Sequence, residues 1–206
     1  MFAFKTRSTS SVSTRFAEFG GFEGYFGQPM RELEFQALRA TIRERGTARM
    51  LLLPVTLALW AAVAVATTAA VAVPIAALVP LIVLAAGFEA IYALHVNVER
   101  IGRYIQVFHE SADGWEHVAM VFGQRFPGRG PDALFSGIFL IATALNYLPV
   151  ALGGTTPELI AAGVLHLLLA FHIGTARRRA SQQRALDLEH FQSLKSDVRG
   201  PLTDGR

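Results

Sequence analysis

Cysteine is absent from the 206-residue chain, which excludes disulfides, thiolate metal sites, iron–sulfur ligation and cysteine nucleophiles. Charge is scarce as well: charged residues make up 17% of the chain, against about 25% in an average soluble domain. No formal charge occurs in the 39 residues between Arg49 and Glu89. An uncharged apolar run longer than about 18 residues is typical of a membrane span. The composition therefore excludes a soluble enzyme, a disordered tail and a secreted disulfide scaffold.

Sequence motifs of common enzymes are also missing. The chain has no Walker motif, no G-x-G-x-x-G, no G-x-S-x-G and no H-E-x-x-H. The Glu-x-x-His spacing of di-metal carboxylate proteins does not occur either. We therefore predict a protein that is not an enzyme and that holds no metal ion.

The long apolar run from 50 to 96 is too long for one membrane crossing. As a single helix it would measure about 70 Å, whereas the hydrocarbon core of a bilayer is about 30 Å thick. The best place for a turn lies between Thr67 and Pro74, because a proline suits the first turn of a new helix. The sequence therefore predicts spans at about 50–69 and 73–96.

Two further apolar runs predict a second pair of spans, at 134–152 and 158–175. Glycine and proline separate these runs, and the arginine triplet at 177–179 is expected to end the last one. We expect Pro54 to lie in the first turn of its helix, where its missing N–H is harmless, and Pro80 to bend the second span.

The fold class that follows is an all-α integral membrane protein with four transmembrane helices arranged as two antiparallel hairpins. All 19 basic residues lie before, between or after the hairpins, and neither short turn contains one. By the positive-inside rule, both termini and the middle connection are cytoplasmic, in a bacterial-type inner membrane. The predicted organisation is a tail (1–28), an amphipathic helix (29–49), a hairpin (50–96), a helical connection (97–133), a second hairpin (134–175) and a C-terminal helix with its tail (176–206).

The first 28 residues are rich in aromatic side chains set among glycine and serine. Because fully disordered tails usually lack aromatics, this segment is interpreted either as a docking segment for a partner or as a tail whose rings rest on lipid headgroups. The residues expected to bind are Phe16, Phe19, Phe22, Tyr25 and Phe26.

The regions outside the spans show helical periodicity. A helix is predicted to start at Pro29, either lying along the membrane surface or running directly into the first span, with a bend at Gly46. A short amphipathic helix is predicted at 115–123. The second span is expected to continue to Glu110, and residues 180–198 read as a separate helix. Their apolar stripes include Ile101, Ile105, Phe108 and Phe191. Such stripes need a cover, either from the other cytoplasmic helices, from a second copy or from a different subunit.

Histidines near the cytoplasmic ends of two spans suggest a redox alternative. His95 and His172 are predicted at similar depths, and facing histidines on two helices can ligate a b-type haem. The competing interpretation is that both are interfacial, and that His166, which is well inside the fourth span, hydrogen-bonds to a neighbouring helix. We expect no cofactor, with haem b or a quinone contact as the alternative.

Glu89 and Asn146 are polar groups inside predicted spans, and intramembrane carboxylates are functional candidates by default. Glu89 and His166 would serve a homo-oligomeric channel or transporter. The competing interpretation has Glu89 near the headgroups, accepting a hydrogen bond from Tyr147, Asn146 or a neighbouring subunit.

The function favoured by these observations is a non-catalytic membrane subunit or scaffold of a larger assembly. The predicted partners are membrane lipid and other membrane subunits or copies of the chain, and no nucleic acid is expected.

Overall fold

A computed structural model describes residues 22–71, 73–111, 113–126 and 131–199, and every regular element in these ranges is helical. The elements are α2 (Phe22–Ala70), the 3₁₀ helix η2 (Pro74–Ala77), α3 (Leu78–Phe108), α4 (Trp115–Arg125), α5 (Pro131–Gly153) and α6 (Thr156–Arg199). Four helical stretches are long and apolar enough to cross a membrane: part of α2, η2 with α3, most of α5, and α6. The all-α class and the four candidate membrane helices are thus confirmed.

The chain divides into two units, Met1–Ala40 and Thr41–Arg206. The described part of the first unit is the beginning of α2. Its helix starts at Phe22 and not at Pro29, so Phe22, Tyr25 and Phe26 belong to a helix rather than to the predicted tail. Phe16 and Phe19 lie outside the described residues.

Side-chain pairs one turn apart support this early part of α2. Gln36 Nε2 donates to Glu32 Oε1 at 2.9 Å, and the Arg39 guanidinium lies 5.2 Å from the centre of the Phe35 ring. Pairs four residues apart stabilise an exposed helix by a few tenths of a kcal/mol each. They stabilise the part of α2 that was predicted as an amphipathic helix at 29–49.

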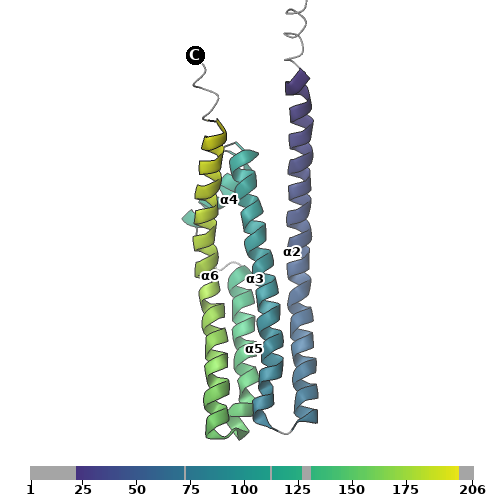
Figure 1. Cartoon of the computed structure of the whole chain (residues 1–206), viewed down its shortest axis with the longest axis vertical. Coiled ribbons are helices and arrows are strands. Elements are labelled where there is room, and N and C mark those ends of the chain that lie inside the picture. Colours follow the sequence, from purple (N-terminus) through teal and green to yellow (C-terminus); the bar gives the residue numbers. More distant parts are fainter. Residues whose placement is uncertain (1–21, 72, 112, 127–130, 200–206) are drawn as a thin grey trace, which may run out of the picture. The chain divides into compact units, whose positions relative to one another are not determined.

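In the second unit, α3, α5 and α6 lie side by side along their apolar halves (Figure 1). The core between them is made of Leu84, Phe88, Ile91, Phe139, Ala142, Ile173 and Ala176. Residues of α2 reach this core only as partly buried side chains, among them Leu53, Leu57 and Trp60. The apolar stretch of α2 is 6% buried, against 33%, 33% and 22% in the other three. Most of its apolar side chains are therefore not covered by the rest of the chain.

The turn between α2 and η2 lies where the sequence predicted it, but Pro54 and Pro80 occupy different positions in their helices than predicted. α2 ends at Ala70 and Pro74 opens η2, as the spacing predicted. Pro54 lies deep inside α2 and not in a first turn, because the helix runs through Gly46 without a break. Pro80 falls in the first turn of α3, so it does not interrupt the middle of that helix. Proline is tolerated in membrane helices because neighbouring groups compensate the lost hydrogen bond.

Both α3 and α6 continue beyond the start of α5 (Figure 1). We call these continuations, residues 97–108 of α3 and 176–199 of α6, the extension. The helix predicted at 180–198 is not separate from the last span, because α6 is continuous through the arginine triplet at 177–179. Arginine is a good helix former, so the triplet ends the apolar stretch and not the helix.

Two reciprocal ion pairs join the helices of the extension. Glu99 of α3 pairs with Arg184 of α6 at 2.8 Å, and Arg100 of α3 pairs with Asp187 of α6 at 3.1 Å. Asp187 is buried and also accepts a hydrogen bond from Gln183 at 2.9 Å. Because each helix supplies one acid and one base, the two pairs are matched in only one register.

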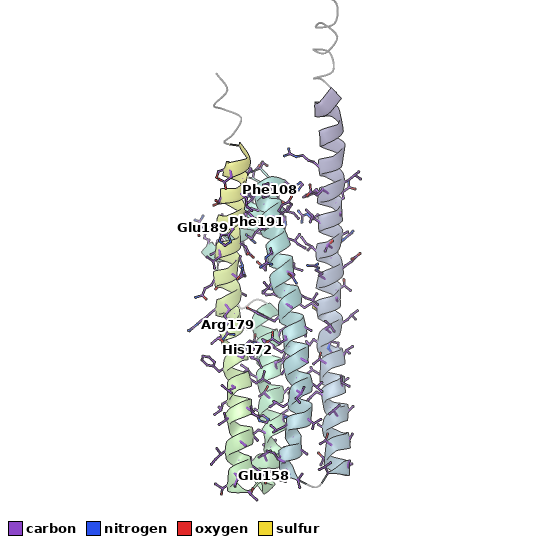
Figure 2. The ribbon with its side chains drawn as sticks, in the orientation of Figure 1. Phe108, Glu158, His172, Arg179, Glu189 and Phe191 are labelled. Carbon is purple, nitrogen blue, oxygen red and sulfur yellow. The ribbon has the colours of Figure 1, made fainter. Side chains whose placement is uncertain are left out.

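Aromatic packing closes the same interface. The ring of Phe191 lies 5.6 Å from that of Tyr104 and 6.3 Å from that of Phe108, both edge-on (Figure 2). Ile105 is fully buried beneath them. The apolar stripe predicted on α3 and that on α6 thus cover one another, which is the first of the three covers considered from sequence.

Candidate functional site

Asn146 on α5 lies at the centre of a buried polar network. Its Oδ1 accepts a hydrogen bond from the Trp60 indole N–H at 2.9 Å. Its Nδ2 donates to the backbone carbonyl of Ala77 at 2.8 Å and lies 3.0 Å from Nε2 of His166. These partners belong to α2, η2 and α6, so one amide side chain joins four elements of the unit.

The contacts of His166 fix its tautomer. Nδ1 lies 2.7 Å from the carbonyl oxygen of Ala162, and a carbonyl only accepts, so Nδ1 carries the proton. Nε2 then accepts from the Asn146 amide, and the ring is neutral. The Tyr147 ring packs 5.1 Å from the imidazole, and its hydroxyl donates to the Leu159 carbonyl at 3.1 Å.

Every polar atom of the Asn146 side chain is therefore satisfied in an apolar environment. An unpaired polar group in hydrocarbon is costly, so such a network holds helices at fixed rotations. His166 hydrogen-bonds to a neighbouring helix, as one of the sequence interpretations had it. Sequence reasoning missed Trp60; the signal for it was a donor-only indole placed in an otherwise apolar span.

Glu89 of α3 meets His172 of α6 in a close carboxylate–imidazole contact. Arg179, two turns along α6, donates to Nδ1 of the same imidazole at 2.9 Å (Figure 2). The edge of the His172 ring also packs on Phe88, 5.8 Å between centres. Glu89 thus pairs with a histidine, one of the partner types considered from sequence, and not with Tyr147 or Asn146.

His95 has a different partner on a different helix. The Arg49 guanidinium of α2 donates to Nδ1 of His95 at 2.8 Å, and it also lies 5.3 Å from the centre of the Phe135 ring of α5. His95 therefore contacts α2, whereas His172 contacts Glu89 and Arg179. The geometry does not bring the two histidines together as an axial pair. Sequence alone did not identify Arg49 and Phe135, because their roles depend on contacts between helices that sequence does not reveal.

Residues expected to bind partners are distributed unevenly. Ile105 is fully buried, while Ile101, Phe108 and Phe191 are half-buried in the extension. These four residues are therefore engaged within the chain.

Several apolar side chains on and just after α4, outside the predicted spans, are exposed. Trp115 is 66% exposed and Phe122 is 62% exposed, and the remaining members of the face are Val118, Val121 and Phe126. The opposite side of α4 is anchored: the Glu110 carboxylate accepts the backbone N–H of Glu116 at 2.8 Å, and Glu116 is buried against Gly102. Spacings of three, four and four residues from Trp115 to Phe126 are the sequence signal for this face.

Among the residues that the structure describes, no group of three or more histidine, aspartate or glutamate side chains is placed to hold a metal ion. No family model, no curated protein and no solved structure matches this chain.

Proposed function

We propose that this protein is a non-catalytic, multi-pass membrane subunit that binds another membrane protein through the exposed face of α4. Its four membrane helices form two antiparallel hairpins in a bacterial-type inner membrane. Both termini, α4 and the extension lie on the cytoplasmic side. The distribution of basic residues supports this orientation, since every lysine and arginine flanks the same ends of the spans.

The observation that carries the proposal is the contrast between α4 and the extension. In the extension Phe108 and Phe191 pack against each other and Ile105 is buried, whereas α4 presents Trp115, Val118 and Phe122 to its surroundings. Contiguous apolar side chains outside a span mark a surface that binds protein or membrane. Tryptophan and phenylalanine are also the residue types enriched at the centres of protein interfaces.

The contacts of the intramembrane polar groups favour the same conclusion over the two alternatives. A channel built on Glu89 and His166 would need these groups along a pore, but each is bonded to a neighbouring helix. A haem or quinone subunit built on His95 and His172 would need both side chains at one ligand, but they have separate partners. These contacts support a structural role for all four residues.

The native mass of the protein, extracted in mild detergent from its own membrane, tests the proposal. We expect a complex larger than the 22.4 kDa chain. Serine at Trp115 and Val118 should release the chain from this complex, because it removes apolar area at the centre of the face. The release should not change the Tm of the isolated chain by more than about 2 °C, because exposed positions contribute little to stability.

A matched control replaces Leu186 and Leu194 by serine. Both are exposed apolar side chains of α6 in the extension, 47% and 53% exposed. This variant should keep the complex. The proposal would be contradicted if the unmodified protein had the native mass of a single chain, or if both variants lost the complex to the same extent.

A further inference from the structure

A cavity of about 500 Å³ opens among the ends of the membrane helices. Its lining includes Arg49, which directly precedes the first predicted span, and His95, in the last turn of the second. Phe135 begins the third span and Arg177 follows the fourth, and both line the same cavity. Four spans therefore reach one boundary at this cavity. Its volume lies within the roughly 300–1,000 Å³ range of small-molecule sites.

One wall of the cavity is cationic. Arg49, Arg177 and Arg184 line it together with His95, and no carboxylate is among the lining residues that the structure describes. Arg184 is paired with Glu99, and Arg49 donates a hydrogen bond to Nδ1 of His95. Arg49 and Arg177 each bring a formal positive charge to the wall. Guanidinium groups match the geometry of phosphate oxygens and bind them with two parallel hydrogen bonds.

Six aromatic side chains also line the cavity, together with Ser136 and Ser181. They are Phe88 and Tyr92 of α3, Phe122 of α4, Phe126 just after it, and Phe135 and Phe139 of α5. A free phosphate ion makes no favourable contact with aromatic side chains, whereas an acyl chain packs against them. The combination of basic and apolar walls at the end of membrane helices is the chemistry of an anionic lipid site.

We propose that this cavity binds an anionic phospholipid, with the phosphate held by Arg49 and Arg177 and one acyl chain packed along the aromatic wall. The site uses none of the residues of the α4 face that the subunit proposal tests, Trp115 and Val118. It depends on the predicted spans and not on the identity of any protein partner. α4 closes one side of the site through Phe122 and Phe126.

Native mass spectrometry of the full-length protein in neutral detergent tests this site. Dioleoylphosphatidylglycerol, dioleoylphosphatidylcholine and inorganic phosphate are added in separate titrations. We expect one phosphatidylglycerol to bind at roughly tenfold lower concentration than phosphatidylcholine, because two arginines favour the anionic headgroup. Phosphatidylglycerol should also raise the Tm by several degrees, because a ligand that binds only the folded state stabilises it.

Glutamine at Arg49 and Arg177 should weaken phosphatidylglycerol binding by roughly tenfold and phosphatidylcholine binding by less, because only phosphatidylglycerol carries a net negative charge. The control variant carries glutamine at Arg43 and Arg178, which removes the same charge from the same two helices at exposed positions outside the cavity. It should bind like the unmodified protein. If the double variant at Arg49 and Arg177 does not fold, Arg177→Gln alone carries the test, since that side chain is exposed; it should weaken binding about threefold.

Equal affinity for the two lipids would overturn the proposal, as would an equal loss in the control variant. A Tm increase with inorganic phosphate as large as that with phosphatidylglycerol would assign the cavity to a free anion and overturn the lipid site.

Discussion

The helices α3 and α6 pack against each other twice, with different chemistry in each place. In their apolar halves the contact is made of core side chains, and neutral hydrogen bonds to Asn146 tie α6 to the rest of the unit. In the extension the contact is made of reciprocal ion pairs and edge-on aromatic rings. The cluster of Glu89, His172 and Arg179 lies between the apolar half and the extension.

The difference follows from the cost of charge in the two environments. At the centre of a bilayer an arginine or aspartate costs at least about 2.5–3.5 kcal/mol, so helix rotation there is fixed by an uncharged amide and a neutral imidazole. In water an ion pair costs little to place and contributes at most about 1 kcal/mol, but reciprocal pairs disfavour a shifted register. One pair of helices therefore needs two sets of side chains to stay in register.

The largest effect is expected from Asn146→Ala. It leaves the Trp60 indole, the His166 Nε2 and the Ala77 carbonyl without this partner in an apolar environment. Intramembrane hydrogen bonds average about 0.6 kcal/mol each, and a buried group left unsatisfied costs about 1–3 kcal/mol. We expect the free energy of unfolding to fall by about 2–4 kcal/mol, measured by denaturant titration in mixed micelles.

Leu145→Ala is the matched control, because it truncates a neighbouring side chain of α5 that is half exposed. Its loss should stay below about 1 kcal/mol, since the side chain is not part of the core. Similar losses in the two variants would show that the apolar half does not depend on the network.

A second prediction concerns the contact between α2 and α3. A Cβ added at Gly87 would lie 2.0 Å from Cγ2 of the buried Thr56 of α2. Gly87→Ala should therefore destabilise the fold by about 1–2 kcal/mol, since overpacking outweighs the gain in helix propensity. Thermal unfolding in detergent measures the change.

Gly137→Ala makes the same substitution where nothing lies within 4 Å of the added Cβ. It should stabilise α5 by up to about 1 kcal/mol. Adding Thr56→Ala to Gly87→Ala should recover part of the loss, because it removes the atom that the new Cβ meets. Stabilisation by both alanines would mean that α2 is not held against α3 at this point.

The four membrane helices could be read from sequence because their signals are one-dimensional. A span is located by comparing the length of an uncharged apolar run with the thickness of a bilayer. The spans at 50–69 and 134–152 could therefore be placed without knowing which residues they contact. Continuity through the arginine triplet could have been predicted too, had helix propensity been separated from hydropathy at 177–179. The start of α2 at Phe22 was not predicted, because glycine at 24 and 27 argued against helix there.

The candidate sites were less predictable, because they depend on how helices are rotated about their axes. Sequence identified Asn146, His166, Glu89 and His172 as unusual, but their partners lie up to 86 residues away, as Trp60 does from Asn146. The stripes of Ile105 and Phe191 could equally have met a partner protein. Only the relative position of α3 and α6 assigned them to each other.

The smallest effect, and the sharpest separation of the two regimes, is expected in the extension. Asp187→Asn should lower the free energy of unfolding by about 1 kcal/mol, because it removes the ion pair to Arg100. The exchange Arg100→Asp with Asp187→Arg should recover part of that loss, whereas Asp197→Asn, an exposed change on the same helix, should have no effect. Repeating each measurement in about 1 M salt should shrink the Asp187→Asn loss, because the Debye length falls to about 3 Å, and leave the Asn146→Ala loss unchanged. Equal salt dependence of the two losses would contradict the division of the helix pair into a neutral and a charged half.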